Sequence, residues 1–107
     1  MKPKHGWNDE ENVVGLYLYL YETDGLGLSE EQILGRLAAK YPSRVPITLG
    51  SMKMKKQNYR HLDIEAGITT PSSYTPLSHP SKPSRRIYAD YRDASQADLR
   101  RHVLEII

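Results

Sequence analysis

The run of residues 13–21, VVGLYLYLY, constrains the fold most, because so apolar a stretch belongs in a protein core. Its alternation of leucine with tyrosine is typical of a strand. The residues before it are typical of a helix start, since Asn8 is suited to be an N-cap and three acidic residues follow it. A strand would leave this capping pattern unexplained, and residues 13, 16, 17 and 20 also share one helical stripe. We therefore predict a helix over residues 9–22.

Three more helices are predicted over residues 30–41, 49–62 and 95–107. Each begins just after a side chain that can cap it, namely Ser29, Thr48 and Ser95. Residues 63–94 contain four of the seven prolines and many serines, and are predicted to form an extended or partly mobile segment. The expected fold is therefore one small, mainly α domain over residues 1–107, of the helix-turn-helix type, with a long Pro/Ser-rich segment before the C-terminal helix.

The composition excludes several chemistries. The 107 residues include no cysteine, which removes disulfides, thiolate metal sites and thiol nucleophiles. The four histidines are scattered without the close pairs typical of zinc sites. No phosphate-loop spacing of glycines and no nucleophile–base pattern is visible. We therefore expect no enzyme, no cofactor and no metal. No apolar run approaches the roughly 18 residues that span a bilayer, and the N-terminus lacks a signal-like apolar region, so we expect a cytoplasmic protein.

Charge is distributed unevenly along the chain, although the formal net charge is only +2. Residues 1–35 carry two lysines against seven acidic residues, whereas residues 36–62 carry seven lysines and arginines and no acidic residue. Two interpretations fit this pattern. The basic block can form a surface for a polyanion, or it can pair internally with the acidic first segment.

The predicted helix over residues 49–62 is amphipathic, with Met52, Tyr59 and Leu62 on one side. A neighbouring arc carries three cations and one amide, which suits the wall of a DNA major groove: Lys53, Lys56, Gln57 and Arg60. The cations are suited to phosphates or guanine edges, and the amide of Gln57 is suited to an adenine edge. A second basic stretch is expected to add phosphate contacts through Lys82, Arg85 and Arg86. The alternative is that both stretches are only solvated surface.

The chain also resembles a known family. Trp7 precedes acidic residues and the LYLY helix, and a second helix is followed by SMKMKKQNYRHLD and then GITTPS. This order is similar to the N-terminal module of some bacterial HNH-type restriction endonucleases and related uncharacterised proteins, where a phrase close to SVxMKLxNFxxLD leads into GL/GIxxxS. The lysine and asparagine of that phrase fall on Lys55 and Asn58, which become additional candidates for DNA contact. Lys56 stands where the family phrase has an apolar residue.

The resemblance implies a helical DNA-recognition module centred on residues 51–62 and linked to restriction or mobile-element biology. It implies no nuclease activity, because the metal-binding nuclease unit of that family would lie downstream. The expected function is thus non-catalytic binding of double-stranded DNA. One alternative is a protein-interaction adaptor that uses the acidic first segment or the apolar C-terminal helix to bind a protein partner. Another is a phage or mobile-element inhibitor. Trp7 and the tyrosines at 17, 19 and 21 are predicted to be core residues rather than a base-stacking platform.

Overall fold

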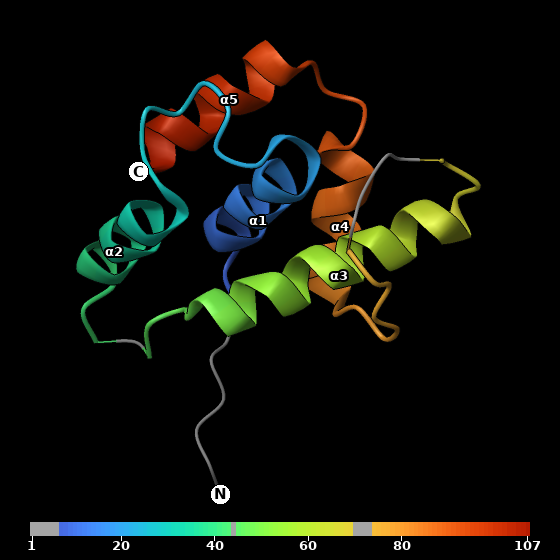
Figure 1. The fold of residues 1–107 in the computed structure, drawn as a ribbon, viewed down its shortest axis with the longest axis horizontal. Helices are drawn as coiled ribbons and strands as arrows, with labels where there is room; N and C mark the ends of the chain where they lie inside the picture. Colours follow the sequence, from blue (N-terminus) through green and yellow to red (C-terminus); the bar gives the residue numbers. More distant parts are fainter. Residues whose placement is uncertain (1–6, 44, 70–73) are drawn as a thin grey trace, which may run out of the picture.

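The computed structural model describes residues 7–43, 45–69 and 74–107. Within these ranges the chain forms helices only, and the mainly α prediction is confirmed (Figure 1). The described helices are α1 (Asp9–Tyr21), α2 (Glu30–Lys40), α3 (Leu49–Glu65), α4 (Lys82–Tyr91) and α5 (Gln96–Ile106). None of these helices is long and apolar enough to cross a membrane.

Helix α1 is the centre of the fold, and α3, α4 and α5 all pack against it. Every residue from Glu11 to Tyr19 is buried, so the helix is enclosed on all sides. This explains the alternating Leu/Tyr run, because a helix that is apolar all round needs no polar face when neighbours cover it. The capping box is present, with Asn8 and Glu11 each accepting a hydrogen bond from the other's backbone N–H. The prediction of a helix rather than a strand is confirmed.

Two further helices bury their apolar stripes, and α2 packs most closely against α3 while α5 packs against α1. Ser29 and Gln32 form a capping box at the start of α2, whose apolar stripe is buried. The stripe of α5 is buried as well, through Leu99, Val103 and Ile106. The apolar face of the C-terminal helix therefore belongs to the protein's own core.

The prediction of an extended segment over residues 63–94 is wrong at both ends. Helix α3 continues to Glu65, and α4 occupies Lys82–Tyr91. Ser81 caps α4 by accepting a hydrogen bond from the backbone N–H of Ser84. Pro83 lies in the first turn, where the missing N–H of proline would have no partner in any case. The proline that indicates a break elsewhere is thus compatible with a helix start here.

Residues 74–81 are not helical, and they are attached to α3. The N–H of Leu77 donates to the carbonyl oxygen of Gln57 at 3.0 Å, and the Asn58 side chain donates to the carbonyl oxygen of Leu77 at 2.8 Å. Tyr74 packs against the core. These contacts hold residues 74–81 against α3 and the core.

Candidate nucleic-acid interface

Helix α3 is the longest described helix, and it lies across α1 and α4 (Figure 1). Its inner face is buried and consists of Met52, Lys55, Lys56, Tyr59, Leu62 and Asp63. At 100° per residue the opposite arc is centred near Gln57. We call this arc the outer face and define it as Leu49, Lys53, Met54, Gln57, Arg60, His61 and Ile64. The helix carries no acidic residue from Leu49 to Leu62, so positive potential is not cancelled on the helix itself over this stretch.

Three predicted contact residues lie on the outer face. Lys53 is exposed, and no described residue pairs with its ammonium group. Gln57 and Arg60 are half-buried and follow Lys53 along the same arc. For these three side chains the helical wheel predicts the correct face.

Lys56 does not lie on the outer face, so its place in the predicted arc is wrong. Its side chain is buried, with an exposed fraction of 4% for the residue. The ammonium group hydrogen-bonds to Glu30, lies 3.3 Å from a carboxylate oxygen of Glu22, and donates to the hydroxyl of Tyr74 at 3.0 Å. Burial alone would lower the pKa of Lys56. The hydrogen bonds that its ammonium group donates to Glu30 and Tyr74, together with the charges of the nearby carboxylates, outweigh burial and raise the pKa. Lys56 is therefore engaged inside the protein and is not available to a phosphate.

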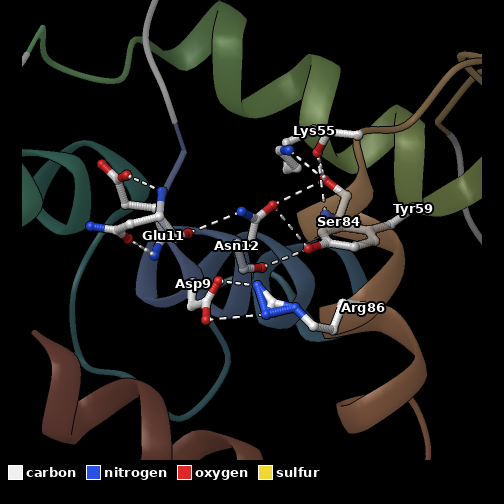
Figure 2. A network of polar contacts seen from close by, with 9 residues as sticks. Asp9, Glu11, Asn12, Lys55, Tyr59, Ser84 and Arg86 are labelled. Atoms are coloured by element: carbon white, nitrogen blue, oxygen red, sulfur yellow. Dashed lines mark hydrogen bonds and ion pairs between the residues drawn. The ribbon is translucent and has the colours of Figure 1, made fainter.

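Lys55, a candidate from the family resemblance, is also buried. Its ammonium group donates to the Ser84 hydroxyl at 2.5 Å (Figure 2). The same group lies 4.6 Å from the ring centroid of Trp7. Its stem passes so close to α1 that a Cβ at Gly15 would meet Lys55 Cγ at 2.9 Å. Burial lowers the pKa of Lys55 to about 8, with the charge of Glu11 opposing the shift. The predicted role in DNA contact does not fit this position.

The network around Lys55 joins three helices (Figure 2). The Ser84 hydroxyl on α4 donates to the side-chain oxygen of Asn12 on α1 at 3.0 Å. The Tyr59 hydroxyl on α3 donates to the backbone oxygen of Asn12 at 2.8 Å, and burial raises the pKa of Tyr59. Because buried polar groups are costly when unpaired, this network fixes how α1, α3 and α4 meet. No spacing in the sequence indicates this network, because the residues that it joins are far apart in the chain. Lys55 and Ser84 are 29 residues apart, and Asn12 and Ser84 are 72 residues apart.

Asn58, the second candidate from the resemblance, faces the loop. Its side chain donates to the carbonyl oxygens of Leu77 at 2.8 Å and Ser78 at 3.4 Å. These bonds hold residues 77–78 against α3. The side chain therefore serves the fold and is not directed at a base.

The second predicted basic stretch lies in the first half of α4. Lys82 and the two arginines are exposed. Arg85 pairs with Glu65 at 3.3 Å, and Arg86 pairs with Asp9 (Figure 2). Exposed pairs of this kind contribute about 0–1 kcal/mol, so either arginine can exchange its carboxylate for a phosphate at low cost.

The internal pairing of acidic and basic segments is seen directly. Glu10 lies 3.1 Å from the ammonium group of Lys40, and Glu22 and Glu30 hold Lys56. The acidic first segment therefore neutralises part of the basic block, and that block is not one continuous cationic surface. Two further cations of the block, Lys53 and Arg60, lie on the outer face of α3.

Asp63 forms a second buried polar centre. Its carboxylate accepts hydrogen bonds from the hydroxyls of Tyr19 at 2.7 Å and Tyr88 at 2.6 Å and from Arg92 Nε at 2.8 Å. The side chain of Asp63 is fully buried. Burial and its hydrogen bond to Asp63 raise the pKa of Tyr88, and the separate hydrogen bond that Arg92 donates to Asp63 raises the pKa of Arg92. This centre joins α1, α3 and α4 and has every described charge in it paired.

A cleft of about 370 Å³ lies between the end of α4 and α5. Tyr91 stacks on His102 there, with ring centroids 5.4 Å apart, and Asp98 pairs with Arg101 on its rim. Sequence reasoning did not predict this cleft. Across residues 7–43, 45–69 and 74–107, no three His, Asp or Glu side chains come together to hold a metal ion.

No family model, curated protein or solved structure matches this chain. The resemblance to HNH-associated modules, its link to restriction or mobile-element biology, and the helix-turn-helix type of the fold therefore stay predictions.

Proposed function

We propose that the protein is a non-catalytic module that binds double-stranded DNA through the outer face of α3. The observation that carries the proposal is the arrangement of Lys53, Gln57 and Arg60 on one accessible arc of a helix that has no acidic residue over residues 49–62. A B-DNA major groove admits an α-helix, and each lysine or arginine that neutralises a phosphate releases counterions. The amide of Gln57, at the centre of the arc, is suited to a base edge.

The cations of α4 are further candidates for phosphate contact. Lys82 is exposed, and Arg85 and Arg86 hold exposed carboxylates that a phosphate can replace. Together with Lys53 and Arg60 they give five cations, each expected to add about 0.9 to the slope of log affinity against log salt if it meets a phosphate. Lys55 and Lys56 are left out of this set because their ammonium groups are bound inside the protein.

The adaptor alternative has less support. It relied on an acidic first segment and an apolar C-terminal stripe as binding surfaces. Glu10, Glu22 and Glu30 are occupied by lysines of the same chain, and the stripe of α5 is buried in the core. On the outer face of α3, by contrast, Lys53 is exposed and no described residue pairs with it.

The test is a fluorescence-anisotropy titration of a labelled random-sequence duplex at two salt concentrations. The double variant K53A/R60A should weaken binding at least tenfold at low salt and lower the salt slope by about two. R101A is the matched control, because it removes an exposed arginine from α5 and should leave affinity nearly unchanged. Absence of salt-dependent binding by the wild type, or equal losses in both variants, would contradict the proposal.

A further inference from the structure

The outer face of α3 carries an apolar side chain beside its cations. Met54 is 55% exposed, the highest value among the large apolar side chains that the structure describes. It follows Lys53 directly and lies three residues, slightly less than one helical turn, before Gln57. Lys53 and Arg60 flank Gln57 on one side of the arc, and Met54 flanks it on the other. Beside the central amide the face therefore has Lys53 on one side and Met54 on the other. Two other exposed apolar side chains lie toward the two ends of α3, namely Leu49 and Ile64.

We infer that this face recognises an A·T-containing DNA site, with Gln57 at an adenine and Met54 at the C5-methyl group of a neighbouring thymine. The inference rests on the proposed function and names its substrate more closely. In the major groove an adenine offers N7 and N6 to a bidentate amide, and thymine is distinguished by an apolar methyl group. A G·C pair lacks the C5-methyl group, and its guanine presents two acceptors, so the amide of Gln57 cannot both donate and accept there as it can at adenine.

The spacing of the two side chains agrees with neighbouring base pairs. Positions i and i+3 on a helix have Cβ atoms about 5–6 Å apart, whereas stacked base pairs are about 3.4 Å apart. Gln57 and Met54 can therefore reach bases one or two steps apart along the groove. The same arrangement leaves Lys53 and Arg60 directed to the other edge of the face, where phosphates lie.

The experiment compares 16-base-pair duplexes of equal length and charge. The first contains alternating dA and dT, the second replaces every dT by deoxyuridine, and the third contains only dG and dC. Loss of a methyl contact should weaken wild-type binding to the deoxyuridine duplex about fourfold. The dG–dC duplex should bind about tenfold more weakly than the dA–dT duplex, because it also lacks adenine.

Variants assign the effects to the two side chains. M54A should bind the dT and deoxyuridine duplexes equally, whereas M54L should keep most of the preference for dT. L104A is the matched control, since Leu104 is 46% exposed on α5 and its loss should leave the preference intact. Q57A should keep the preference for dT over deoxyuridine, and its preference for dA–dT over dG–dC should fall from about tenfold to about fourfold, the part due to the methyl group. Met54 and Leu104 are exposed, so these variants should fold, which thermal unfolding checks.

A fourth duplex separates the methyl group from adenine. A G·C duplex with 5-methylcytosine carries the C5-methyl group without adenine, and the wild type should bind it about 2.5-fold more weakly than the dA–dT duplex. Equal binding to these two would overturn the assignment of Gln57 to adenine. Equal binding to the dT and deoxyuridine duplexes would overturn the assignment of Met54. Either result leaves DNA binding in place, whereas failure of all duplexes to bind at low salt would overturn the proposed function itself.

Discussion

Lys53 and Lys56 are three residues apart on α3, and the structure treats them in opposite ways. Lys53 is exposed and no described group pairs with it, whereas Lys56 is buried and held by two carboxylates and a tyrosine hydroxyl. The inner face of α3 thus uses charge to join helices, and the outer face leaves charge available to a partner. The comparison teaches that the count of cations on a helix does not measure its capacity to bind an anion.

The largest expected effect on the inner face comes from Asp63. Asp63→Ala removes a fully buried carboxylate and leaves Arg92 and two tyrosine hydroxyls without their acceptor. The expected loss is about 3–5 kcal/mol in the free energy of unfolding, measured by urea denaturation. H61A on the outer face is the control and should change stability by less than about 1 kcal/mol. A loss below about 1 kcal/mol for Asp63→Ala would show that this centre does not hold the helices together.

Lys55 makes stability depend on pH. Its pKa is about 8 in the folded protein against 10.5 when exposed, so below pH 8 it is protonated in both states and the cost of burying its charge is fully present. Between pH 8 and 10 the folded state releases this proton first, the unfolded state binds more protons, and stability rises by about 2 kcal/mol. Above pH 10 ionisation of tyrosines such as Tyr59, whose pKa is raised in the folded state, lowers stability again.

Lys55→Met should remove this rise, because methionine fills the same space without a proton to release. Urea denaturation at pH 7, 8, 9 and 10 measures it. K53M is the control and should keep the pH dependence of the wild type. A flat profile in the wild type would mean that Lys55 is solvated in the folded state.

Lys56→Ala should cost about 2 kcal/mol, since it leaves Glu22, Glu30 and Tyr74 without their common partner. Lys53→Ala should change stability by less than about 0.5 kcal/mol. Thermal unfolding of the two variants beside the wild type measures the difference. Equal effects would erase the distinction between the two faces.

The smallest expected effect is on the salt slope of DNA binding, where Lys53 should matter and Lys56 should not. Lys53→Ala should reduce the salt slope of DNA binding by about one, whereas Lys56→Met should leave the slope unchanged, because its charge is neutralised before DNA arrives. Anisotropy titrations at several salt concentrations measure both slopes. A lower slope in Lys56→Met would place that lysine among the phosphate contacts.

Local signals predict most of the helices. The capping pairs at Asn8 and Ser29, and the caps Thr48 and Ser95, are short-range hydrogen bonds that the sequence itself encodes. Helix α4 was missed because Pro80 and Pro83 indicate a break, although a proline in the first turn costs a helix little. The Lys56 and Lys55 sites could not be predicted, because their hydrogen-bond partners lie 18 to 34 residues away and outside α3. The helical wheel predicts the positions of Lys53, Gln57 and Arg60 on the outer face, because the direction of a side chain from a helix follows from its place in the sequence.

Trp7 is the chain's single tryptophan, and its indole ring lies over the ammonium group of Lys55. The protein therefore contains an optical reporter at the junction of its central helices. Indole emission depends on nearby charge, so the fluorescence of Trp7 should change as Lys55 loses its proton near pH 8 and change again when the junction opens. Protonation and unfolding at this position can thus be followed in the unlabelled protein.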